Sequence, residues 1–419
     1  MHAHWPVSLG IALAIFSPAA GQTEESKGSK EQTKRYVLTL SEVRELARAR
    51  APGLLASRAR VDVAQAERVG ASVWQPTNPE FTVAAGPRRL DGEKTGTDLD
   101  VEIGQRFELG ARRRSRLDRA EAGIAKAVAT SNDEERELLR AASAGFLVAL
   151  HAERSLDVAR ESERLFHELR RVTERRYEAG DVGILDPYAA AMAHARSHGR
   201  LAEIEARRVL AVTELRALLG LEVDAEIVVE GELVYRPRYV FEELTALAAT
   251  RTDLQAIEAA IDVAQAEQRL ARGFRSPDLG AFVSYSQEED ADIYKGGLSI
   301  VLPFVNKGQG NAAVARAQER ALRLDLQSAR SVADYQVRGR FEAYSILDVA
   351  AVRFESEALP RLEEMLDLAR QSYEAGNVPF AELLVLQRET VETRLAYLDL
   401  LLQAALAATE LEAAAGVLP

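Results

Sequence analysis

The 419-residue sequence contains no cysteine, and aromatic residues make up only 6% of it. Without cysteine, disulfide bonds, thiolate metal sites, a cysteine nucleophile and a lipidated N-terminal cysteine are all excluded. Hydrophobic residues make up 47% of the sequence. A hydrophobic chain with so few aromatic residues suits long packed helices better than a β-rich core. We therefore expect a mainly α-helical protein with a small β part.

An excess of positive charge is also missing. The chain carries 53 basic and 65 acidic residues, a formal net charge of −12, whereas binding to nucleic-acid phosphates depends on clustered lysine and arginine. The sequence also lacks H-E-x-x-H, a P-loop and G-x-S-x-G. We expect no nucleic-acid partner, no cofactor and no enzymatic activity.

Long hydrophobic runs are scarce, and the one at the N-terminus predicts a signal peptide over 1–21. The apolar run 7–16 is followed by small residues at 19–21; an uncleaved membrane anchor is the alternative. Residues 22–37 are polar and expected to be flexible. Because no later run is long enough for a membrane helix, we expect an exported chain that enters a membrane, if at all, as a closed barrel.

The rest of the chain contains an internal duplication. DVAQAE occurs at 62–67 and again at 262–267, and YEAG occurs at 177–180 and again at 373–376, in the same order and at nearly the same separation. A single period near 200 residues predicts a duplicated domain rather than a solenoid of short repeats. The predicted parts are a first repeat over 38–222, a connector over 223–240 and a second repeat over 241–416.

Each repeat predicts a helical segment, a β-hairpin, a long helix and a returning helix. A helix breaks at prolines because proline lacks the N–H and fixes φ, and alternation of apolar and polar residues over 99–104 indicates a strand. The expected ranges are helices 40–73 and 241–273, β-hairpins about 79–108 and 277–305, long helices 112–178 and 311–374, tips about 177–183 and 373–379, and return helices 184–219 and 379–415.

The long helices need a partner along their whole length. At 1.5 Å per residue, the first spans roughly 100 Å, and residues Val158, Leu165, Leu169 and Val172 have the spacing of a coiled-coil-like seam. We expect long antiparallel helical hairpins. Each strand is close to the roughly 9–11 residues that cross a bilayer, and four strands cannot close a barrel alone, so closure needs several chains. Two soluble β-hairpins that cap a helical bundle are the alternative.

This order of elements, with the YEAG tips and the stretch Gln105-Arg106-Phe107-Glu108-Leu109-Gly110, resembles the TolC-type outer-membrane efflux proteins. Asn78-Pro79-Glu80-Phe81 and Arg112-Arg113 resemble the heavy-metal cation (CzcC-like) branch. The resemblance implies a homotrimer with an α-barrel in the periplasm and a twelve-stranded β-barrel in outer-membrane lipid, joined to a periplasmic adaptor and an inner-membrane pump.

The function that the resemblance implies is the outer-membrane channel of a tripartite efflux system; heavy-metal cations are slightly favoured over drugs as its cargo, and both stay open. The alternative is a soluble periplasmic adaptor or scaffold built from helical hairpins, although an adaptor normally has a single hairpin and compact β-domains.

The resemblance places adaptor docking at the tips, on Tyr177, Gly180, Tyr373 and Gly376. Small residues there allow two backbones to approach closely. The alternative is that each glycine only ends a helix in the left-handed conformation and each tyrosine packs in the seam.

The resemblance also implies a periplasmic gate at Asp186, Tyr373 and Glu382. Three copies of Glu382 would form an anionic ring that favours cations; the alternative is a solvated glutamate near a helix N-terminus. Val182 and Val378 stand where a basic partner is expected, which makes a salt bridge at the tips doubtful.

Two further groups have weaker interpretations. His194 and His198 are four residues apart on a predicted helix, but two ligands without a third make a poor metal site, so no metal is expected. Arg112, Arg113, Arg114 and Arg116 begin the first long helix below the strands, where they are expected either to contact lipid headgroups or to form a solvated face.

Overall fold

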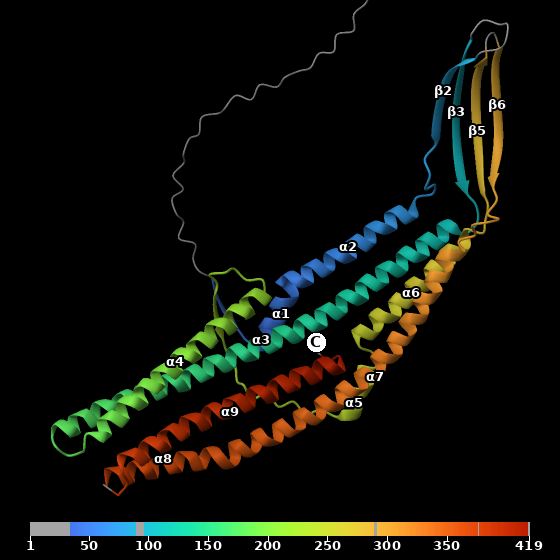
Figure 1. The fold of residues 1–419 in the computed structure, drawn as a ribbon. Coiled ribbons are helices and arrows are strands. Elements are labelled where there is room, and N and C mark those ends of the chain that lie inside the picture. Colours follow the sequence, from blue (N-terminus) through green and yellow to red (C-terminus); the bar gives the residue numbers. More distant parts are fainter. Residues whose placement is uncertain (1–33, 89–95, 289–290, 376, 418–419) are drawn as a thin grey trace, which may run out of the picture.

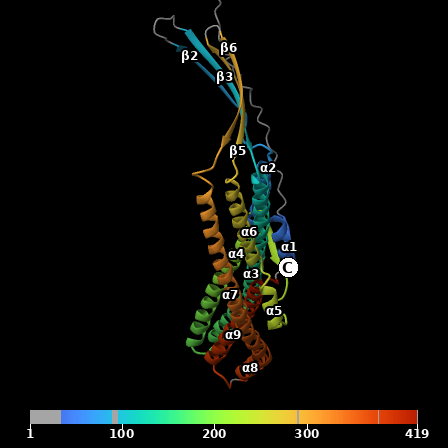
Figure 2. The same ribbon diagram turned by 90° about the vertical axis from the view of Figure 1, so that its right-hand side faces the viewer.

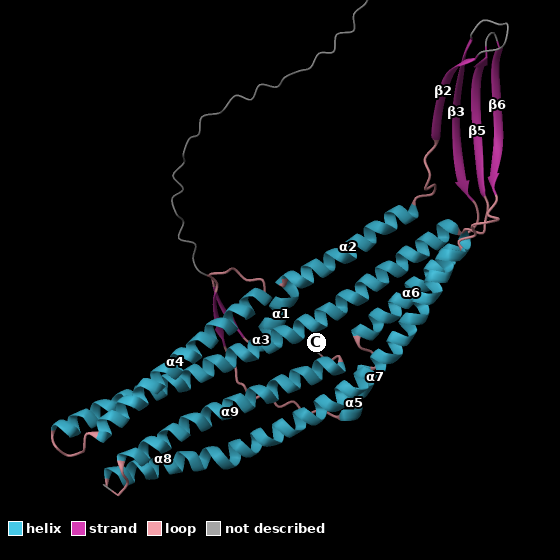
Figure 3. Ribbon diagram, in the orientation of Figure 1, coloured by secondary structure: helices cyan, strands magenta, loops and turns pink. Residues whose placement is uncertain are grey.

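The computed structural model describes residues 34–88, 96–288, 291–375 and 377–417. Its long helices run along one axis, and a four-stranded sheet extends beyond one end of them (Figures 1, 2 and 3). The protein is therefore mainly α-helical with a small β part, as its composition predicts. The predicted signal peptide and most of the segment 22–37 lie outside the described residues.

The two halves of the chain have the same order of elements. The first half contains β1 (Arg35–Leu38), α1 (Leu40–Arg50), α2 (Pro52–Ser72), β2 (Glu80–Arg88), β3 (Gly96–Glu108), α3 (Arg112–Glu178) and α4 (Leu185–Leu218). The second contains β4 (Glu226–Val229), α5 (Phe241–Ala248), α6 (Thr252–Gly273), β5 (Asp278–Glu288), β6 (Ala291–Val301), α7 (Gln309–Arg353), the π-helical turn η1 (Phe354–Ala358), α8 (Leu359–Glu374) and α9 (Phe380–Ala415).

The 67-residue helix α3 has the bounds that the sequence predicts. The side chains that it buries within the chain differ from the predicted seam, because Val172 is exposed and Leu165 and Leu169 are only half-buried. The buried row consists mainly of the small residues Ala152, Ser155, Ala159, Ser162 and Thr173, with the larger Phe166 between the last two. Their spacing alternates mostly between three and four, as in a coiled coil, and their size lets neighbouring helices approach closely.

Both helical segments that precede the β-hairpins are broken, where the sequence predicted one helix each. The first breaks at Ala51, because the proline that follows, Pro52, cannot continue a helix. Pro52 instead begins α2, at a position where its missing N–H costs nothing. The second breaks between α5 and α6 without a proline. There the guanidinium of Arg251, which is 7% exposed, donates to the carbonyl of Ala414 at 3.1 Å and so satisfies a C-terminal carbonyl of α9.

The second long helix is interrupted as well. The sequence predicts a continuous helix over 311–374 that contains Pro360, whereas the structure places the π-helical turn η1 directly before α8. Proline removes one helical hydrogen bond and its ring collides with the preceding turn. A wider π turn accommodates that disruption without ending the helix.

The four-stranded sheet is antiparallel, with the order β2-β3-β5-β6. Two β-hairpins are present as predicted, and the register of the central pair runs from Leu99 opposite Gln287 to Glu108 opposite Asp278. The second hairpin is slightly shorter than the expected range 277–305, because β5 begins at Asp278 and β6 ends at Val301. Alternating side chains are sufficient to place a strand but do not mark its ends.

A second, smaller sheet lies beside the middle of the helices. Strand β1 pairs in parallel with β4, with Tyr36 opposite Ile227. Residues 35–37, expected to be flexible, are thus part of a strand, and the predicted connector supplies its partner. Both strands contact the largest apolar core, to which α3, α4 and α9 contribute residues such as Leu147, Leu215 and Leu401.

Among the described residues, no helix combines the length and apolarity needed to cross a bilayer.

Candidate functional site: the helical tips and the cleft behind them

The first helical hairpin, α3–α4, ends in a turn fixed by Gly180. Its φ of +82° lies in the left-handed region, where a side chain is strained. The amides of Gly180 and Asp181 donate to the carbonyls of Tyr177 and Arg176 at 2.9 Å each, the two bonds of a Schellman motif. Nothing lies within 4 Å of where a Cβ of Gly180 would be, so this turn projects into open space.

The second helical hairpin, α8–α9, ends in a related turn. The amide of Asn377 donates to the carbonyl of Ser372, five residues earlier, at 2.9 Å. The bond from Asp181 to Arg176 at the first tip has the same spacing. Gly376 lies outside the described residues. The two tips lie at the end of the molecule opposite the four-stranded sheet (Figure 2).

One arginine connects the two tips. The guanidinium of Arg176, in the last turn of α3, donates to the hydroxyl of Tyr373 at 2.6 Å. The guanidinium carbon also lies 5.5 Å from the centre of the Tyr373 ring, and that ring packs at 5.8 Å against Phe380. Arg176 is not among the residues predicted for the tips, because the basic partner was expected after each glycine, at Val182 and Val378. The only sequence signal is a basic residue beside Tyr177.

The two acidic residues of the expected gate occupy equivalent places. Asp186 and Glu382 each lie in the first turn of a returning helix, where a carboxylate is favoured by the helix dipole. Asp186 is half-buried and Glu382 is exposed. The hydroxyl of Tyr373 accepts its side-chain hydrogen bond from Arg176.

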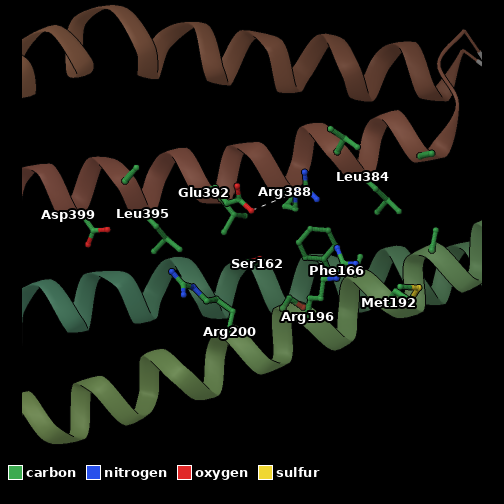
Figure 4. Close-up of a pocket in the computed structure, with 17 residues that line it drawn as sticks. Ser162, Phe166, Met192, Arg196, Arg200, Leu384, Arg388, Glu392, Leu395 and Asp399 are labelled. Atoms are coloured by element: carbon green, nitrogen blue, oxygen red, sulfur yellow. Dashed lines mark ion pairs between the residues drawn. The ribbon is translucent and has the colours of Figure 1, made fainter.

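Behind the tips, α4 and α9 diverge over α3 and leave a cleft of about 730 Å³ (Figure 4). Its floor is apolar, with Phe166 and Leu395, and its walls carry charged residues. The charged side chains are Arg196, Arg200, Arg388, Glu392 and Asp399.

At the end of this cleft, Oδ1 of Asp399 lies 2.9 Å from Nε2 of His151. Burial lowers the pKa of His151 and outweighs the opposing attraction of the exposed Asp399 carboxylate. The imidazole is therefore held toward its neutral form.

His194 and His198, which are four residues apart on α4, do not turn toward one another. His194 turns toward α3, where its Nε2 lies 3.0 Å from Oε1 of Glu163 and its ring lies 5.1 Å from the ring of His167. His198 is exposed. The sequence signal for this group is the pair Glu163 and His167, four residues apart on α3; the spacing of the histidines on α4 does not reveal it.

The arginines at the start of α3 fasten the helices to the sheet. Arg112 is 5% exposed and forms an ion pair with Asp278, which begins β5, while Arg116 pairs with Glu108 at the end of β3. Arg113 donates to the carbonyl of Ser72. Neither of the two expected environments, lipid headgroups or a solvated helix face, holds for Arg112 and Arg116, because both charges form ion pairs inside the chain.

The model of one protein family, the outer membrane efflux proteins, matches the chain twice, at residues 43–221 and 244–417. The chain belongs to the outer membrane efflux protein family. The two matches coincide with the two repeats read from DVAQAE and YEAG. Proteins of this family are transport components without enzymatic activity, and the match decides against the alternative of an adaptor or scaffold.

Individual relatives agree with this family. The cobalt-zinc-cadmium resistance protein CzcC of Cupriavidus metallidurans is 25% identical and covers 96% of this chain and 97% of its own length. The structure is similar to that of CusC, with a TM-score of 0.74, 16% identity and coverage of 90% and 92%. It is also similar to the open state of the Neisseria gonorrhoeae channel MtrE, with a TM-score of 0.71, 18% identity and coverage of 90% and 89%. These structural likenesses show a shared fold.

Proposed function

We propose that this protein is the outer-membrane channel of a tripartite efflux system. In this proposal three copies assemble into one duct, with a twelve-stranded barrel in the outer membrane and a helical tunnel in the periplasm. A periplasmic adaptor docks at the tips formed by Tyr177, Gly180, Tyr373 and Gly376 and links the duct to an inner-membrane pump. Asp186, Tyr373 and Glu382 line the gate.

The observation that carries the proposal is that the two ends of the elongated molecule differ. The four-stranded sheet lies at one end and both helical tips lie at the other, separated by a helix of roughly 100 Å. Such a length is far more than a globular core needs, and it suits a protein that bridges two distant partners. The ion pairs of Arg112 and Arg116 join the helices to the sheet at one of these ends.

Heavy-metal cations are the proposed cargo. The support is the relative CzcC, whose name describes resistance to cobalt, zinc and cadmium, together with the net charge of −12. Carboxylates along a duct raise the local concentration of cations and disfavour anions.

Two measurements test the proposal separately. Detergent-extracted protein is expected to have the mass of a trimer and to conduct ions in a planar bilayer; a water-soluble monomer without conductance would overturn the channel. Deletion of the gene is expected to sensitise cells to cobalt, zinc or cadmium. Unchanged tolerance to all three metals, with conductance intact, would overturn only the cargo.

A further inference from the structure

Three side chains of types that can bind a metal converge between the two helices of the first helical hairpin. Glu163 and His167 come from α3, and His194 comes from α4. One ligand atom from each lies within 4.8 Å of the other two, and the closest pair, Oε1 of Glu163 and Nε2 of His194, is separated by 3.0 Å. In a tetrahedral site with bonds of about 2.1 Å, neighbouring ligand atoms are about 3.4 Å apart. Small side-chain rotations would bring all three to that spacing.

The backbone already positions these groups. Glu163 and His167 are four residues apart, so they share one face of α3. His167 lies thirteen residues before Gly180 and His194 lies fourteen residues after it, so the two histidines face each other across the hairpin at roughly 20 Å from the tip. Two rigid, packed helices thus hold the ligands, which limits the reorganisation that binding requires.

The repeat shows that the helical hairpin does not need this cluster in order to fold. With Tyr177 aligned to Tyr373, the equivalent positions in the second repeat are Leu359, Glu363 and Thr390, a set that contains no imidazole. The second hairpin nevertheless forms the same antiparallel pair. The histidines are therefore an addition to the common architecture.

We propose that Glu163, His167 and His194 form a binding site for a divalent cation of the zinc class. Two imidazole nitrogens and one carboxylate oxygen are ligands that zinc accepts, whereas magnesium and calcium prefer oxygen alone. Nε2 of His194 binds through its lone pair, so its hydrogen bond to Glu163 is replaced and the ring proton resides on Nδ1. His167 is exposed, which gives the ion access and leaves a coordination position for water.

Binding would cross-link α3 to α4 and stiffen the first helical hairpin alone. The site does not rest on the proposed transport function, because it is complete within one chain and needs no adaptor or pump. Its test therefore uses the isolated protein and zinc ions, and its failure would leave the channel and its cargo unaffected.

The sharpest test uses the absence of native cysteine. In His167→Cys the new thiolate is itself a zinc ligand, and it is the one thiol that maleimide can label. Zinc is expected to slow labelling of His167→Cys at least about tenfold and to leave labelling of the matched variant His198→Cys unchanged. Equal protection of both thiols, or of neither, would overturn the site.

Equilibrium dialysis of zinc provides the second measurement. The native protein is expected to bind one ion per chain, and His167→Asn and His194→Asn are each expected to bind at least about tenfold more weakly. His198→Asn is the control. Native mass of each variant checks that the protein is still assembled, and equal affinities for native protein, His167→Asn and His194→Asn would show adventitious binding only.

Discussion

Arg176 of the first helical hairpin donates a hydrogen bond of 2.6 Å to the hydroxyl of Tyr373 of the second. The bond joins two turns that are 197 residues apart in the chain, and the guanidinium carbon also lies 5.5 Å from the centre of the same ring, within the range of a cation–π contact. Within the described residues, a single chain thus links its two tips through a hydrogen bond from a guanidinium to a phenolic hydroxyl.

Removal of this bond is expected to favour the open channel. A partly exposed hydrogen bond from a charged group is worth about 1 kcal/mol, so Arg176→Ala or Tyr373→Phe should raise the ratio of open to closed channel roughly fivefold. Single-channel recording in planar bilayers measures this ratio. Arg175→Ala is the matched control, because Arg175 is exposed and its Nε donates only to the carbonyl of Arg171. The same ratio in both variants and in native protein would show that the bond does not hold the gate.

Gly180 separates the effects of backbone strain and bulk. Gly180→Ala strains the left-handed turn by about 1 kcal/mol but adds little volume, whereas Gly180→Trp adds the same strain and a large side chain. We expect native mass and bilayer insertion to survive both substitutions, and adaptor binding and efflux to be abolished by tryptophan only. Co-purification with the adaptor and metal tolerance of cells measure the outcome. Loss of the trimer in Gly180→Trp would contradict the docking role.

Glu382 is expected to contribute to cation selectivity. Its exposed carboxylate lies in the first turn of α9, and in the proposed trimer three copies form a ring of negative charge. Glu382→Gln should lower the permeability ratio of potassium to chloride, measured from reversal potentials in a salt gradient. Glu389→Gln, an exposed glutamate farther along α9, serves as the control. Unchanged selectivity in Glu382→Gln would place this carboxylate outside the constriction.

The buried position of His151 is expected to make the folded protein less stable in acid. Because burial lowers its pKa in the folded protein, the unfolded chain binds more protons once the pH approaches the ordinary histidine pKa of about 6.5. The stabilisation is present above that pH and is lost as the pH falls through the lowered value. Thermal unfolding between pH 7.5 and 5.5 should show a smaller decrease of Tm in His151→Gln than in native protein, with His198→Gln as the control. Identical pH dependence in all three proteins would exclude His151 as the source.

The sequence predicts those parts of the fold that depend on local patterns. The absence of proline over 112–178 set the length of α3, and the repeated YEAG set the position of both turns. Pro52 and Pro360 were visible signals for the broken helices. By contrast, the pairing of β1 with β4 joins segments about 190 residues apart, and no short pattern specifies such a contact.

The polar contacts of the core could not be predicted from the sequence either. Glu412 is 6% exposed, and its carboxylate accepts hydrogen bonds from Tyr235, Tyr239 and Arg44. A glutamate on a long helix is usually solvated, and only the fold brings three donors to it. The same holds for Arg176 and Tyr373, whose meeting depends on how the two helical hairpins pack.

The four-stranded sheet has a consequence for symmetry. In its described part, β2 and β6 each pair on one side only, and because the number of strands is even, they run in opposite directions. Joining β6 of one chain to β2 of the next therefore continues the antiparallel pattern for any number of chains. Strand direction therefore does not fix the number of chains in the proposed assembly, and the packing of the long helices of neighbouring chains becomes one of its determinants.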